Sequence, residues 1–233
     1  MDMQKLGEYA AEYKIELTGK MLDDFSLYAD MLVEWNEKVN LTAITDPEGV
    51  IIKHFLDSIL GLQYIKNTCS LIDVGTGAGF PGIPIKIVRP DVDLTLLDSL
   101  NKRVNFLAAV SERLRQNNNC VHSRAEDAAK KTGHREKYNI VTARAVSAFP
   151  VLCEYCLPFV KQGGAFLAYK GPEVEPELLL GRSAVKKLGG KIEKTAIFEL
   201  PMNNTRSIVV VKKISQTPAK YPRNQAQITK TPL

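Results

Sequence analysis

Three glycines, Gly75, Gly77 and Gly79, follow a short apolar segment that contains Asp73. Glycine lets the backbone turn sharply at the end of a strand, because it lacks a Cβ atom and tolerates positive φ angles. It also leaves room for a ligand close to the peptide plane, toward which a following helix directs its free N–H groups. The spacing therefore predicts a ligand-binding loop between a strand and a helix.

Two kinds of cofactor would suit such a loop. Residues 77–82 match the dinucleotide fingerprint G-x-G-x-x-G, and the acidic Asp98 follows about 20 residues later. The alternative takes Asp73 and the three glycines together, as class I S-adenosyl-L-methionine-dependent methyltransferases do. An acid before the first glycine would repel a pyrophosphate but attract the cationic end of a zwitterionic cofactor. The residues favour the methyl donor over the dinucleotide, and a turn without any ligand is the third interpretation.

In methyltransferases of this class the loop wraps the methionine part of the cofactor. An acid at the end of the second strand holds the ribose hydroxyls, and Asp98 has that place here. The pattern therefore predicts a set of cofactor-binding residues, which are Asp73, Gly75, Thr76, Gly77, Gly79 and Asp98.

The elements around the loop are short apolar strands that alternate with helices. This alternation predicts a parallel α/β sheet, and the short link between the last two strands predicts an antiparallel hairpin at the sheet edge. The expected class is a Rossmann-like α/β fold with a mostly parallel seven-stranded sheet, an antiparallel edge strand and N-terminal helices. The predicted strands are 71–74, 94–97, 120–121, 138–143, 165–169, 191–199 and 207–211.

Residues 1–66 predict a helical cap. Apolar side chains from Met21 to Val39 recur at spacings of four and three, which places them on one helix face as core residues. Asp46 and Pro47 predict the start of another helix, as its N-cap and first-turn residue. On that helix His54 and Asp57 share a side, and a structural hydrogen-bonded pair is their simplest interpretation.

The predicted domain organisation has three parts. A Rossmann-like methyltransferase domain over residues 67–214 follows the helical cap over 1–66. Residues 215–233 hold few apolar side chains and no acid, so they are expected to form an extended basic tail.

Charge is unevenly distributed along the chain. Residues 1–66 carry a formal charge of −6, residues 67–199 carry +5 and residues 200–233 carry +6. The basic portion favours an anionic partner, and nucleic acid is the first candidate for that partner. No apolar run approaches the ~20 residues of a membrane span. Four cysteines without an export signal indicate the cytoplasm.

The pair Cys153 and Cys156 is a single C-x-x-C. Zinc needs four ligands, and the sequence offers no suitable second pair. We interpret the two cysteines as small packing residues and expect no metal.

The segment from Leu71 to Pro84, LIDVGTGAGFPGIP, resembles the bacterial ribosomal small-subunit methyltransferase G family, also called glucose-inhibited division protein B. Trp35–Thr42, Ala143–Ala145 and Tyr221–Arg223 support the resemblance. It implies transfer of a methyl group from S-adenosyl-L-methionine to N7 of a guanine in the decoding region of 16S rRNA, within the small ribosomal subunit. A cytoplasmic monomer is expected. The tail departs from the family's more basic, glycine-containing form at residues 224–227.

The resemblance also assigns roles to individual residues. It implies that Gly75, Phe80, Ala125, Glu126 and Arg144 contact the cofactor, with Ala125 and Glu126 beside the adenine. It further implies a basic cluster of Arg124, Arg144 and Lys170 near the cofactor, which would bind RNA phosphate or the target base. Independently of the family, Arg144 and Lys170 end predicted strands at the edge where ligands bind, although surface ion pairing is the plain alternative.

Guanine N7 carries an in-plane lone pair and no proton, so its methylation needs no general base. The enzyme has only to align nitrogen, methyl and sulfur. Because Arg and Lys naturally bind N7, we predict that Arg144 and Lys170 hold phosphate or O6 instead and leave N7 free. The target base would have to be splayed out of its stack.

Other functions stay open on the residues alone. Methylation of pyrimidine C5 would need a cysteine in an activating setting, and the sequence shows none. Methylation of an exocyclic amine usually goes with an Asn/Asp-Pro-Pro-aromatic loop, where this chain has Ala143–Val146. The alternatives are a methyltransferase for another RNA base or a small molecule, a nicotinamide-dependent oxidoreductase, and a non-catalytic RNA-binding protein.

Overall fold

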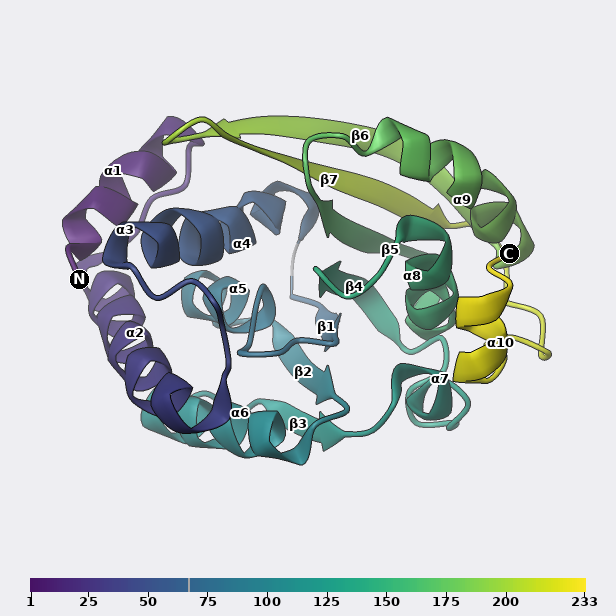
Figure 1. Cartoon of the computed structure of the whole chain (residues 1–233), viewed down its shortest axis with the longest axis horizontal. Coiled ribbons are helices and arrows are strands. Elements are labelled where there is room, and N and C mark those ends of the chain that lie inside the picture. The colour runs from purple at the N-terminus through teal and green to yellow at the C-terminus, as the bar shows by residue number, and fades with distance from the viewer. Residues whose placement is uncertain (67) are drawn as a thin grey trace.

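Seven strands form one sheet in the spatial order β3-β2-β1-β4-β5-β7-β6. The structure is a computed structural model that describes residues 1–66 and 68–233 (Figure 1). All seven predicted strands are confirmed, and β5 begins earlier than predicted. The strands are β1 (Ser70–Val74), β2 (Asp93–Asp98), β3 (Asn119–His122), β4 (Tyr138–Arg144), β5 (Val160–Lys170), β6 (Gly190–Leu200) and β7 (Asn204–Lys213).

The strand pairing confirms a mostly parallel sheet. β1 to β5 pair in parallel, whereas β7 runs antiparallel to both β5 and β6. The predicted hairpin is present, but its antiparallel strand β7 lies one position inside the edge, which β6 occupies. The reason is that β6 pairs along the outer side of β7, from Gly190 opposite Lys213 to Leu200 opposite Asn204.

Helices cover both faces of the sheet, because successive strand residues point to opposite faces. Leu71 belongs to one hydrophobic cluster, and its neighbours Ile72 and Val74 belong to the other. The first face is covered by α1 (Met3–Glu12), α2 (Gly19–Val39), α3 (Pro47–Gly49), η1 (Val50–Leu56), α4 (Asp57–Ile59), η2 (Leu60–Tyr64), α5 (Gly82–Val88) and α6 (Asn101–Arg113) (Figure 1). The second is covered by α7 (Ala125–Ala128), α8 (Phe149–Cys156), η3 (Leu157–Phe159), α9 (Glu175–Lys187) and α10 (Gln225–Lys230).

The third helical segment starts where the sequence predicts. The Asp46 carboxylate accepts the Gly49 N–H at 2.6 Å, and Pro47 lies in the first turn. The residues after it form a π-helix, η1, where the sequence predicted an ordinary helix. Such segments are frequent at functional sites, and η1 carries His54.

The expectation of an extended tail is wrong. The C-terminal residues contain α10, and Tyr221 and Ile228 are buried in the second hydrophobic cluster. Arg223 forms an ion pair with Glu154 of α8 at 2.6 Å. The composition of the segment did not predict this arrangement, because the contacts that hold it against α8 come from only a few of its residues.

The predicted boundary between cap and sheet falls at residue 67, which lies outside the described residues. The N-terminal helices share one hydrophobic cluster with the sheet. In the part of the chain that the structure describes, none of the helices is long and apolar enough to cross a membrane.

Candidate functional site

The glycine loop has the backbone that its residues predict. Gly75, Gly77 and Gly79 have φ angles of 66°, 61° and 100°, in the region that favours glycine. The Gly75 N–H donates to the Leu97 carbonyl at 2.8 Å, which ties the loop to β2. A Cβ atom at Gly75 would lie only 2.8 Å from Cγ2 of Val146. Glycine is therefore required at this position for two reasons, backbone conformation and close approach.

Asp73 lies beneath the loop and holds it in place. Its Oδ2 accepts hydrogen bonds from the Thr76 hydroxyl at 2.5 Å and the Gly82 N–H at 3.0 Å, and its Oδ1 accepts one from the Thr142 hydroxyl at 2.8 Å. Complete burial raises the pKa of Asp73 to about 6, and these hydrogen bonds oppose the rise. Asp73 and Thr76 thus bond to the protein itself, and neither lines the pocket above the loop.

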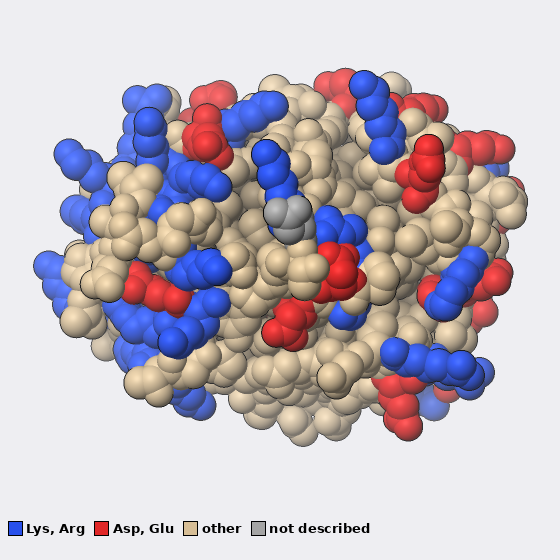
Figure 2. All heavy atoms as spheres, turned by 180° about the vertical axis from the view of Figure 1, so that it is seen from behind, with Lys and Arg blue, Asp and Glu red and all other residues tan. Residues whose placement is uncertain are grey.

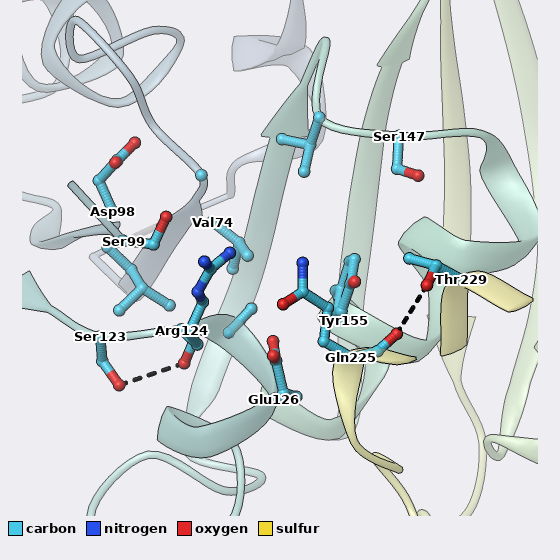
Figure 3. Close-up of a pocket in the computed structure, with 14 residues that line it drawn as sticks. Val74, Asp98, Ser99, Ser123, Arg124, Glu126, Ser147, Tyr155, Gln225 and Thr229 are labelled. Atoms are coloured by element: carbon cyan, nitrogen blue, oxygen red, sulfur yellow. Dashed lines mark hydrogen bonds between the residues drawn. The ribbon is translucent and has the colours of Figure 1, made fainter. Parts of the chain in front are cut away.

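A pocket of about 270 Å³ opens at the carboxyl ends of β1 to β4 (Figure 3). Of the predicted site residues, Gly75, Asp98, Arg124, Ala125 and Glu126 line it. Sequence reasoning missed the residues that complete its wall. They are Val74, Leu97, Ser99, Ser123, Val146, Ser147, Tyr155, Gln225 and Thr229.

Asp98 links the pocket to the glycine loop. One carboxylate oxygen accepts the Gly77 N–H at 2.9 Å, and the other accepts the Leu100 N–H at 2.9 Å. Arg103 lies 3.7 Å away. Gly77 is therefore positioned by Asp98 and is not itself part of the pocket wall.

Glu126 is the clearest sign of a ligand in this pocket. Its side chain is 6% exposed and points into the pocket (Figure 3). Among the residues that the structure describes, its carboxylate has no hydrogen-bond or ion-pair partner. Because this carboxylate faces the open pocket, its oxygens are available to accept hydrogen bonds from a ligand.

A second pocket of about 340 Å³ contains Arg144 and Lys170. It adjoins the first along the segment after β4, because Ala145 lines the second pocket whereas Val146 and Ser147 line the first. The rest of its lining is Ile44, Lys53, His54, Asp57, Tyr169, Gly171, Glu177 and Arg206.

Arg144 is bonded to residues far away in the sequence. Its guanidinium pairs with Asp57 at 2.7 Å and contacts Nδ1 of His54 at 3.3 Å. His54 and Asp57 share a side as predicted, but each bonds to Arg144. Burial and the positive charge of Arg144 lower the pKa of His54 to about 3, so this imidazole is neutral. Its ring stacks on Phe80, with centroids 4.4 Å apart.

The predicted basic cluster is divided between the two pockets. Arg124 lines the first pocket, and Arg144 and Lys170 line the second. The Lys170 ammonium pairs with Glu177 at 2.7 Å and donates to the Ser147 carbonyl at 3.1 Å. Phe80, predicted to contact the cofactor, lies instead beneath Arg144 and His54 and does not line the first pocket.

The cysteines of the C-x-x-C lie in the core. Cys153 and Cys156 are fully buried in α8. Burial raises the pKa of both thiols, so neither has the activated character that methylation of pyrimidine C5 requires.

The family model described as rRNA small subunit methyltransferase G matches residues 21–208. The chain belongs to this family. It is 51% identical over 210 residues to the Ribosomal RNA small subunit methyltransferase G of Alkaliphilus metalliredigens, with 88% of each chain covered. It is 46% identical to the protein of that name from Bacillus subtilis, with 100% of this chain and 99% of the other covered. The predicted family and the cofactor class, S-adenosyl-L-methionine, are thereby confirmed.

Solved structures support the fold class. A methyltransferase from Pyrococcus furiosus aligns with a TM-score of 0.57 at 16% identity, covering 83% of this chain and 98% of that one. The PH0226 protein from Pyrococcus horikoshii aligns with a TM-score of 0.54 at 14% identity, with 77% and 98% covered. At these identities the likeness concerns the fold alone, and it confirms a Rossmann-like class I methyltransferase fold.

Proposed function

We propose that this chain transfers a methyl group from S-adenosyl-L-methionine to N7 of a guanine in 16S rRNA of the small ribosomal subunit. The observation that carries the proposal is the adjacency of two different pockets. The first lies at the glycine loop and holds the Glu126 carboxylate, which has no partner among the described residues. The second is lined by Arg144, Lys170 and Arg206 together with Asp57 and Glu177. Ala145 lines the second pocket, and Val146 and Ser147 line the first, so the two pockets lie side by side along this segment.

The residues of the first pocket fit the methyl donor. Gly75 would allow the methionine part to lie against the backbone, Asp98 would hold the ribose hydroxyls, and Ala125 and Glu126 would border the adenine. The other predicted cofactor residues act indirectly: Asp73, Thr76, Gly77 and Gly79 shape the loop, and Phe80 supports Arg144. When bound, the donor supplies a methyl group on a sulfonium centre.

The second pocket offers groups that match guanine. Lys170 has three N–H donors, and protein acceptors take two of them, which leaves one for guanine O6. Glu177 stands beside it and can accept from the N1–H. Arg144 and Arg206 add positive charge for a phosphate. Neutral His54 stacks on Phe80 and keeps Arg144 in place, and no side chain has to remove a proton from N7.

The surface charge suits an RNA substrate. Lys and Arg side chains gather on one side of the face in Figure 2, which is the back of the molecule as seen in Figure 1, behind the side of α7 to α10. Such a surface attracts the phosphate backbone without reading its sequence. We further propose a cytoplasmic monomer in which residues 1–66 cap the domain over 67–214 and residues 215–233 form its tail.

The test is methyl transfer from the tritiated donor to small subunits from a strain that lacks this gene. We expect incorporation, and mass spectrometry should place the methyl group on one guanine of 16S rRNA as N7-methylguanine. Transfer to another base, or to a metabolite but not to RNA, would reject the proposal. Calorimetry with NAD serves as a control, for which no binding is expected.

A further inference from the structure

The C-terminal segment, which the sequence predicted to be an extended tail, lies at the first pocket. Helix α10 places Gln225 and Thr229, four residues apart and hence on one helix face, in the pocket wall. The tail is therefore part of the pocket and not only a surface feature.

The tail is firmly held in this position. Ile228 is fully buried, and the Asn224 side chain caps α10 by accepting the Gln227 N–H at 2.9 Å. Arg223 donates to both carboxylate oxygens of buried Glu154, at 2.9 Å and 2.6 Å. The Arg135 guanidinium donates to tail carbonyls at 2.8 Å. A side chain on α10 is thus presented to the pocket from a fixed backbone.

The side-chain amide of Gln225 is free to bind a ligand. It has no hydrogen-bond partner among the described residues; only the backbone carbonyl of Gln225 is engaged, by the Thr229 hydroxyl at 2.9 Å. The amide points into the pocket on the side of Arg124 and Glu126 (Figure 3). A carboxamide offers one acceptor oxygen next to two N–H donors.

Adenine is the part of the cofactor that matches this group. Its N6 amino group is a donor next to the N7 acceptor, and a Gln amide can bind both at once. We propose that Gln225 binds the adenine edge of the cofactor and that α10 closes the adenine end of the pocket. The inference rests on the proposed function only for the identity of the cofactor.

The test compares Gln225→Ala with Gln227→Ala in the full chain. Gln227 is a matched control, because it lies exposed on the same helix and does not line the pocket. Calorimetry with S-adenosylhomocysteine should show binding weakened about tenfold by Gln225→Ala, as two ordinary hydrogen bonds would give. Gln227→Ala should bind as the wild type does.

A second ligand separates adenine recognition from a structural role. S-inosylhomocysteine keeps the N7 acceptor but replaces the N6 amino donor by an oxygen acceptor, so the Gln amide cannot bind both positions. The wild type should therefore prefer S-adenosylhomocysteine, and Gln225→Ala should reduce that preference. Unchanged binding by Gln225→Ala, or an equal loss for both ligands, would overturn the inference. A wild-type chain that binds S-adenosylhomocysteine but does not methylate rRNA would count against the proposed function alone.

Discussion

Replacement of Gly75 by alanine is expected to impair the cofactor pocket more than it impairs the fold. Gly75 has a φ angle of 66°, and its Cβ position lies 2.8 Å from Val146 Cγ2. The left-handed backbone conformation costs an alanine about 1–2 kcal/mol. Carbon atoms prefer separations of about 3.5–4.0 Å, so Val146 would have to move by about 1 Å. Because Val146 lines the pocket, this movement changes the surface that the cofactor contacts.

Gly77 provides the matched control for this change. Its φ angle is 61°, nearly the same as that of Gly75, but nothing lies within 4 Å of its Cβ position. Gly77→Ala should therefore lower the free energy of unfolding by about 1–2 kcal/mol through backbone strain alone. The difference between the two variants isolates the effect of the close approach.

Urea denaturation and calorimetry with S-adenosylhomocysteine measure the two quantities. We expect both variants to lose similar stability, with some additional loss for Gly75→Ala. The dissociation constant should rise by about tenfold or more for Gly75→Ala, the effect of about 1.4 kcal/mol, and should change little for Gly77→Ala. Equal loss of affinity in both variants would refute the argument, since backbone strain alone would then account for it.

Three further predictions concern the second pocket. Arg144→Ala should abolish most activity and lower the free energy of unfolding by about 2 kcal/mol, because it removes the hydrogen-bonded partner of the buried Asp57 carboxylate and leaves only Arg206, at 3.7 Å; urea denaturation measures the loss, and wild-type stability would contradict it. His54 has a pKa of about 3 in the folded chain and 6.5 as its ordinary value, so its contribution to stability is present above pH 6.5 and lost as the pH falls toward 3. In stability curves measured against pH, His54→Gln should remove that part of the acid sensitivity, and an unchanged slope would speak against a neutral His54. Lys170→Met should reduce methyl transfer without changing the affinity for S-adenosylhomocysteine, and equal losses of both would show that Lys170 serves the first pocket instead.

The sequence predicted the features that depend on neighbouring residues. The strands could be placed because apolar runs are local, and the glycine loop because positive φ angles demand glycine at Gly75, Gly77 and Gly79. The start of the third helical segment at Asp46 is equally local, since capping joins residues three apart. These local patterns predicted the fold class and the part of the first pocket that the glycine loop forms.

The features that depend on distant residues escaped prediction. Arg144 bonds to Asp57 across 87 positions, and no periodicity indicates such a partner. The same holds for Arg223 and Glu154, which are 69 positions apart and keep the tail against α8. The sequence predicted that Asp73 contacts the cofactor, whereas Asp73 bonds to the loop itself. An acid before a glycine loop has the same sequence pattern in both cases, so the pattern cannot distinguish them.

The outer strands of the sheet affect how copies of the chain meet one another. β6 has an unpaired edge, but Lys191, Glu193 and Lys194 are exposed along it, and its register shifts between Ile192 and Lys194. Charges and bulges at such an edge discourage a further strand from pairing. At the opposite end β3 is only four residues long. Growth of the sheet by strand addition from a second molecule is therefore disfavoured on both sides.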